Sequence, residues 1–219
     1  MRGGKTAALA LAAMAVLVCS TGLSAHRRDE YLQAARLAID PDRVELELDL
    51  TPGIAVADAV MMEIDRDANM SISAAEARAY SERVLSTVAL DVDAGPLRVE
   101  LVDSDLPAVD SVRRGEGTLR IHAVAHLPRL ADGLHHLRYR NAYRSDISVY
   151  LANALIPASD RVTVGAQRRD VDQRDLLVDY TLRGDPATRV REGLPAGVAG
   201  ALVVLVNVWW RRRAREDVS

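Results

Sequence analysis

Cysteine, lysine and phenylalanine are nearly missing from this chain of 219 residues, which has one cysteine, one lysine and no phenylalanine. The single cysteine, Cys19, has no partner for an intramolecular disulfide, so a hydrophobic core must hold the fold together. Both tryptophans lie near the carboxyl end, at Trp209 and Trp210. A core of Val, Leu, Ile and Ala suits a β scaffold. It does not indicate an aromatic-lined ligand groove.

The first 25 residues show the three parts of a secretory signal. Arg2 and Lys5 precede an apolar run over residues 7–18, and small residues follow as far as Ala25. The apolar run is short for a membrane span, so we predict cleavage after Ala25 and export of the remainder. An uncleaved anchor and a lipoprotein modified at Cys19 are the alternatives.

The carboxyl end has the pattern of a membrane anchor. Residues 194–210 are 17 residues without a charged side chain, at the lower limit of a spanning helix. Trp209 and Trp210 then mark an interface, and four arginines within residues 211–219 form a cytoplasmic stop-transfer cluster. A buried or interfacial helix is the alternative. The predicted organisation is a signal peptide (1–25), an ectodomain (26–183), a linker (184–193), a transmembrane helix (194–210) and a cytoplasmic tail (211–219).

Charge separates the ectodomain from the two ends. Between His26 and Gly193 there are 22 arginines and no lysine against 29 acidic residues, a formal net charge of −7. An acidic exported domain is a poor candidate for binding nucleic acid and a good candidate for binding cations. We therefore expect a bacterial single-pass protein of the cell membrane, with a periplasmic or extracellular ectodomain and no nucleic-acid partner.

The ectodomain alternates between apolar and polar residues in many short segments, which predicts a mainly β fold. Strands are expected over residues 31–39, 43–50, 117–127, 135–143, 160–167 and 175–183, together with two short strands around Ala94 and Gly95. Residues 103–118 are expected to form a mobile loop. The predicted architecture is an antiparallel β-sandwich-like ectodomain.

Residues 54–90 interrupt the strands with helical spacing. Val60, Met61 and Ile64 share one helical face, and Tyr80 and Val84 share another. We expect a helix–loop–helix unit inserted after the first long strand, residues 43–50.

The segment DRDANMSISAAE, residues 65–76, joins the two predicted helices and matches the EF-hand calcium loop. That loop places side-chain oxygens at its first, third, fifth and ninth positions, a backbone carbonyl at the seventh and a bidentate glutamate at the twelfth. The alternating oxygens surround a hard cation, and the exiting helix brings back the last carboxylate. This segment resembles the calcium loop of the EF-hand family. Its candidate ligands are Asp65, Asp67, Asn69, Ser71, Ser73 and Glu76.

One position departs from the EF-hand pattern. The sixth residue is Met70 and not glycine, at a turn that requires a positive φ. A second interpretation of the segment is a capping box, in which Ser73 caps the second helix and Glu76 reaches back. A single loop without a partner loop favours a structural role for Ca²⁺ over calcium sensing.

The five histidines offer a different metal chemistry. His122 and His126 share one face of a predicted strand, and His135 and His136 follow a turn, so a hairpin would bring imidazoles together. His26 would form the mature amino terminus. The alternative function is therefore a transition-metal (Ni, Cu or Zn) binding or delivery module.

Nothing in the sequence indicates an enzyme. The chain lacks a G-x-S-x-G motif and a phosphate-cradling glycine loop. Asp103, Asp105 and Asp110 have no identified base or partner. An unrecognised hydrolase is the third and least supported alternative.

Residues 26–150 resemble the periplasmic amino-terminal region of bacterial nickel/cobalt-permease-like and hydrogenase/urease accessory membrane proteins. The matching segments are SAH at the cleavage point, PDRVELELDL, the D-x-D-x-N loop with AEARAY, LDVDAGPL and LRYRNAYRSD. Those proteins continue into several membrane helices, whereas this chain has one predicted anchor. The resemblance implies an exported, non-enzymatic accessory domain, with a metal-transport or other membrane assembly as its protein partner.

Overall fold

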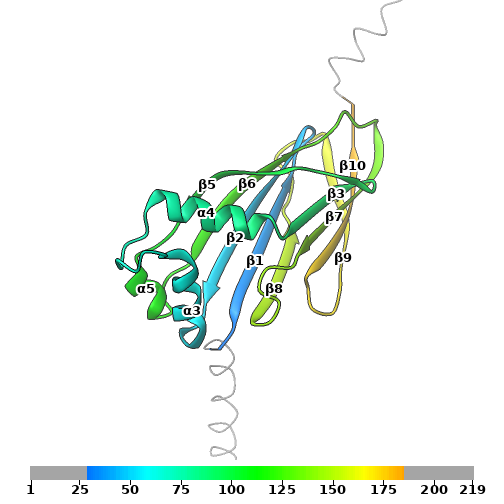
Figure 1. Ribbon diagram of the computed structural model, residues 1–219. Coiled ribbons are helices and arrows are strands. Elements are labelled where there is room, and N and C mark those ends of the chain that lie inside the picture. The colour runs from blue at the N-terminus through cyan, green and yellow to red at the C-terminus, as the bar shows by residue number, and fades with distance from the viewer. Residues whose placement is uncertain (1–28, 185–219) are drawn as a thin grey trace, which may run out of the picture. The chain divides into compact units, whose positions relative to one another are not determined.

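The computed structural model describes residues 29–184, which fold into two five-stranded sheets and three helices (Figure 1). The elements in chain order are β1 (Tyr31–Ile39), β2 (Arg43–Pro52), α3 (Ile54–Ile64), α4 (Ala74–Leu85), β3 (Val88–Val92), β4 (Gly95–Pro96), β5 (Val99–Asp105), α5 (Val109–Arg113), β6 (Leu119–His126), β7 (Gly133–Asn141), β8 (Ser148–Ala154), β9 (Val162–Arg169) and β10 (Asp175–Leu182).

The first sheet has the order β5-β6-β2-β1-β8, and the second has the order β4-β3-β7-β10-β9. All pairs are antiparallel except β1 with β8, which is parallel. The two strands predicted first along the chain form β1 and β2, which pair as a hairpin with Ile39 opposite Val44 across the turn at residues 40–42. The mainly β prediction is therefore correct.

The apolar faces predicted from the alternation meet in one core between the sheets. From the first sheet, Leu46, Leu48 and Ile121 are buried, and from the second, Leu137 and Val178 are buried. Their alternate neighbours point outward, as a strand period of two requires. The buried residues of this cluster lie between Tyr31 and Leu182, inside the compact unit that ends at Leu182.

Three predicted segments differ from the structure. The second helix was expected to continue to residue 90, but it ends at Leu85, because the hydroxyls of Ser86 and Thr87 bond the carbonyls of Arg83 and Val84, both at 2.7 Å. Residues 103–118 were expected to be a mobile loop. They contain the end of β5 and the helix α5, which buries Val109 and Val112.

The third difference concerns the strand after the β3–β4 turn. Only two residue pairs join β3 to β4, after which the chain crosses to the first sheet and continues as β5 beside β6. The strand β8 was not predicted from the sequence. Its outward residues Val149 and Leu151 are apolar and half exposed. A strand that is apolar on both faces lacks the alternation by which strands are recognised.

The helices α3, α4 and α5 gather at one end of the sheets, where α4 runs along β5 and α5 packs on α3 (Figure 1). The predicted signal peptide, His26, the linker beyond residue 184, the transmembrane helix and the basic tail all lie outside the described residues. Among residues 29–184, no helix combines the length and the apolar character needed to cross a membrane.

Candidate metal centre

Two helix ends hold the loop of residues 65–76. Asp65 ends α3 and donates its backbone N–H to the carbonyl of Met61 at 2.8 Å. Ser73 is the N-cap of α4. Both helices are anchored by apolar faces: Val60 and Ile64 of α3 and Val84 of α4 are almost completely buried. The loop therefore starts and finishes at fixed points.

Three predicted ligands converge in this loop. Carboxylate oxygens of Asp65, Asp67 and Glu76 lie within 4.8 Å of one another. In the part of the chain that the structure describes, no other group of three or more His, Cys, Asp or Glu side chains meets this condition. Asp65 is buried, Glu76 is partly buried and Asp67 is exposed, so the cluster opens to solvent on one side.

Backbone donors orient the loop oxygens. Oδ1 and Oδ2 of Asp65 accept the N–H groups of Asn69 at 3.1 Å and of Met70 at 2.9 Å. Asp67 accepts the backbone and side-chain N–H groups of Asn69, and the Oδ1 of Asn69 accepts the N–H of Ser71 at 2.8 Å. A carboxylate has about four lone-pair sites, so these bonds fix its direction and leave capacity for a cation.

Glu76 serves the capping box and the cluster together. Its Oε2 accepts the hydroxyl of Ser73 at 2.7 Å and the backbone N–H of Ser73 at 3.0 Å, and its Oε1 accepts the N–H of Arg66 at 2.9 Å. The hydrogen bonds from Ser73, followed by the bond from Arg66, lower the pKa of Glu76 to about 2. The carboxylate is therefore ionised throughout the physiological range. The capping-box interpretation is confirmed, and it is compatible with a metal site.

Met70 adopts the conformation that the pattern requires at the sixth position. Its φ is 68°, in the left-handed region, and Ala68 also has a positive φ of 56°. Non-glycine residues are uncommon in this region and cost about 1–2 kcal/mol there. Such strain is typical of ligand-binding loops. The Met70 side chain is half exposed, and its Sδ accepts from Nη1 of Arg113 on α5 at 3.0 Å.

The other predicted ligands, Asn69, Ser71 and Ser73, occupy the same loop and make the hydrogen bonds described above. All the donor atoms on offer are oxygens, from carboxylates, an amide, a hydroxyl and the backbone. Such a set suits a hard divalent cation and is a poor match for a soft metal.

A polar cluster that the sequence did not reveal ties both helices to the sheets. Glu63, near the end of α3, accepts the hydroxyl of Tyr143 at 2.8 Å and forms an ion pair with Arg144. On α4, the hydroxyl of Tyr80 is hydrogen-bonded to that of Tyr31 in β1. Burial, the largest cause, raises the pKa of Tyr31, Tyr80 and Tyr143 above the usual range, so these phenols stay protonated donors.

The described histidines do not converge on one point. β6, which carries His122 and His126, belongs to the first sheet, and β7, which carries His135 and His136, belongs to the second. The expected hairpin between these strands is therefore wrong, because β6 pairs with β2 and β5.

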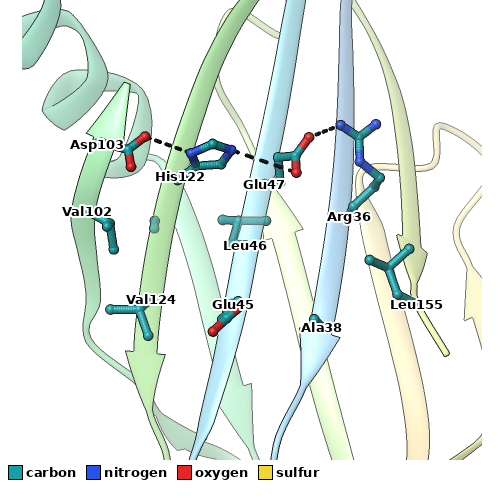
Figure 2. Close-up of a pocket in the computed structure, with 11 residues that line it drawn as sticks. Arg36, Ala38, Glu45, Leu46, Glu47, Val102, Asp103, His122, Val124 and Leu155 are labelled. Atoms are coloured by element: carbon teal, nitrogen blue, oxygen red, sulfur yellow. Dashed lines mark hydrogen bonds and ion pairs between the residues drawn. The ribbon is translucent and has the colours of Figure 1, made fainter. Parts of the chain in front are cut away.

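Three of these imidazoles have separate carboxylate partners: His122 with Asp103 at 2.6 Å, His135 with Asp93 at 2.7 Å, and His136 with Asp179 at 2.8 Å (Figure 2 shows the first).

Asp103 thus has a basic partner that sequence reasoning missed. We expected it in a loop, but it lies in β5 next to His122 of β6. The alternation of residues before position 102 was the only local sign of strand β5. Such alternation does not show which strand lies beside it. Asp105 ends β5 and Asp110 lies in α5.

In comparisons with protein-family models, with curated proteins and with solved structures, nothing matches this chain.

Proposed function

We propose that residues 65–76 bind Ca²⁺ in the manner of an EF-hand loop, in a non-enzymatic, exported accessory domain that is anchored in the cell membrane. The observation that carries this proposal is the conformation of Met70, with a φ of 68° at the sixth position of a loop whose carboxylates lie within 4.8 Å. A capped helix start needs neither the left-handed residue nor the convergence of Asp65 and Asp67.

The ligand set favours Ca²⁺ over other hard cations. Ca²⁺ takes six to eight oxygens in flexible geometry, whereas Mg²⁺ requires a near-ideal octahedron and usually keeps several waters. The loop offers Asp65, Asp67, Asn69, the carbonyl of Ser71 and the carboxylate of Glu76, with Ser73 acting directly or through water. Extracellular modules of this type bind Ca²⁺ with Kd values of about 10⁻⁴–10⁻³ M.

The role we propose for Ca²⁺ is structural. A sensor opens its helix pair when it binds Ca²⁺. Here α3 is bonded through Glu63 to Tyr143 of the β7–β8 connection, and α4 is bonded through Tyr80 to Tyr31 of β1. Opening the helix pair would break these hydrogen bonds and leave buried polar groups without partners. Bound Ca²⁺ would instead offset the mutual repulsion of the three loop carboxylates and stiffen the helical insertion.

The proposed location rests on the two ends of the chain. The signal pattern of residues 1–25, the apolar segment over residues 194–210 and the arginines after it support a topology with the ectodomain outside and the tail inside. The membrane is then one partner, and the resemblance to accessory membrane proteins suggests a metal-transport or other membrane assembly as a second.

Calcium calorimetry tests the proposal on a fragment of residues 29–184, which contains both sheets and the core between them. We expect saturable binding with a Kd between about 1 µM and 1 mM, lost in Glu76→Gln. Glu82→Gln is the matched control, because the substitution removes the same charge from the same helix. Glu82 pairs with Arg78 and lies outside the loop. Absence of binding heat and of a thermal shift at about 5 mM Ca²⁺ would overturn the proposal.

A further inference from the structure

The outer face of the first sheet carries a hollow of about 490 Å³ that the calcium proposal does not use (Figure 2). Its lining includes the apolar side chains of Val102, Val124 and Ala38. At one end it contains Asp103 of β5, His122 of β6 and Glu47 of β2, which the strand order places on three adjacent strands.

The hydrogen bond to Asp103 determines which nitrogen of His122 carries the proton. Nδ1 lies 2.6 Å from Oδ1 of Asp103, and an ionised carboxylate only accepts, so Nδ1 is the donor. A neutral imidazole has one N–H group, and its Nε2 is then a free acceptor. The side chain is partly exposed, so Nε2 is accessible from the hollow.

Glu47 presents a second acceptor to the same point. Its Oε1 is held by Arg36 and by the Nε of Arg120 at 3.2 Å, which leaves Oε2 directed at His122. Oε2 lies 3.7 Å from Nε2 (Figure 2), beyond a hydrogen bond. Two lone-pair atoms that face each other at this distance attract a cation between them.

The spacing suits one first-row divalent metal ion. Zn²⁺ binds histidine nitrogen and carboxylate oxygen at about 2.0–2.2 Å, which separates two ligands of one ion by about 3–4 Å. Metal-bound histidines commonly donate their other N–H to a carboxylate that fixes the tautomer and the ring orientation. Asp103 holds this position relative to His122.

We propose that Nε2 of His122 and Oε2 of Glu47 form a second metal site, for a borderline divalent ion of the Zn²⁺ class, with Asp103 as the positioning residue. Water completes the coordination shell, and the open coordination positions face the hollow. The site differs from the cluster of imidazoles expected from the sequence, because it uses one histidine and one carboxylate. It is independent of the calcium loop, which offers oxygen ligands alone and lies on the helical insertion.

The surrounding charges limit the affinity. The carboxylates of Glu45, Glu47 and Asp103 line the hollow, and the guanidinium groups of Arg36 and Arg120 are paired with Glu47. One net negative charge and two protein ligands predict a weak site, with a Kd of about 10 µM to 1 mM.

The test uses the fragment of residues 29–184, which lacks His26 and therefore any amino-terminal histidine chelate. Histidine side chains are labelled with ¹⁵N, and Zn²⁺ is titrated to about 1 mM at about pH 7.5, with about 5 mM Ca²⁺ present to occupy the loop. Binding is read from the Nε2 resonance of His122. The resonances of His135 and His136, which have other carboxylate partners, serve as internal references.

We expect a saturable shift at Nε2 of His122, with binding at least about 10-fold weaker in Glu47→Gln and about 10–100-fold weaker in Asp103→Asn. His126→Gln is the matched control, because His126 lies on the same strand and face, and its replacement should leave the affinity unchanged. If Zn²⁺ leaves the His122 resonance unmoved up to about 1 mM, the proposal is wrong. Equal Zn²⁺ affinity in wild type and Glu47→Gln would also overturn it. Calcium binding by the loop is measured separately on the same fragment, so failure of this proposal and failure of the calcium proposal can be told apart.

Discussion

Met70 shows how one residue can keep a loop geometry that its side chain disfavours. Its φ of 68° places it where glycine is the usual choice. The fold compensates with two contacts, the bond from the backbone N–H of Met70 to Asp65 at 2.9 Å and the contact of Sδ with Arg113. The backbone cost and the side-chain contact are therefore separable by mutation.

Replacing Met70 by Gly and by Ala separates the two effects. Both variants lose the contact with Arg113, but only Met70→Gly relieves the left-handed strain. The strain is about 1–2 kcal/mol, and the greater freedom of glycine in the unfolded chain offsets part of it. We therefore expect Met70→Gly to be more stable than Met70→Ala by about 1 kcal/mol in urea unfolding with saturating Ca²⁺. Equal stability of the two variants would mean that residue 70 does not hold a positive φ in solution.

At the scale of the element, the turn between β3 and β4 depends on a histidine–carboxylate pair. Asp93 and Ala94 both have positive φ values, 50° and 65°. Asp93 accepts Nδ1 of His135 at 2.7 Å and the backbone N–H of His136 at 2.9 Å. Burial disfavours the charged imidazole, but the bonds to Asp93 and to the carbonyl of Ala131 outweigh it and raise the pKa of His135. The bond from His135 lowers the pKa of Asp93.

These shifts predict a pH-dependent stability. A raised histidine pKa stabilises the fold fully below the ordinary imidazole pKa of about 6.5, and the stabilisation is lost as pH rises through the raised value. Asp93, with its lowered pKa, contributes above the ordinary Asp pKa of about 3.9 and loses its contribution as pH falls further.

The urea midpoint of the wild type should therefore fall between about pH 6 and pH 8.5, and His135→Gln should flatten this part of the curve. His136→Gln is the control, because His136 is half exposed and pairs with Asp179 on the outer face. An unchanged slope in His135→Gln would show that another group titrates in this range.

At the scale of the whole molecule, Tyr143 connects the helical insertion to the first sheet. Its hydroxyl bonds Glu63 of α3, its ring packs edge-on against Tyr31 and Tyr80, and its carbonyl accepts the side-chain N–H of Gln33 at 2.9 Å. A residue in the β7–β8 connection thus contacts α3, α4 and β1. The loop of residues 65–76 begins two residues after Glu63.

Tyr143→Phe removes one hydroxyl from this connection and leaves the ring packing intact. We expect a loss of about 1–3 kcal/mol, because Glu63 loses a donor in a partly buried position, and faster hydrogen exchange in α3. Tyr150→Phe is the control, since its hydroxyl bonds the carbonyl of Tyr143 at 2.7 Å and does not reach α3. Equal hydrogen-exchange rates in α3 for the two variants would mean that the hydrogen bond between Tyr143 and Glu63 does not stabilise this helix.

Local pattern was a reliable guide wherever a few neighbouring residues decide the outcome. The alternation of β2, the helical faces that bury Val60 and Val84, and the capping box at Ser73 were all predictable, because strand and helix periods and helix caps act within a few positions. The need for a left-handed residue at Met70 was predictable for the same reason. Of the candidate ligands in residues 65–76, the carboxylates of Asp65, Asp67 and Glu76 converge in the structure.

The sequence by itself therefore determined the β character, the helical insertion and the order of oxygens in the loop. Tertiary structure alone decided that β5 leaves the β3–β4 turn to pair with β6, that β6 and β7 lie in different sheets, and that His122 stands between Asp103 and Glu47. The physical reason is that an alternating strand specifies which of its faces is buried and not which strand lies beside it. The neighbour is set by the packing of the two sheets around their common core, which involves residues far apart in the chain.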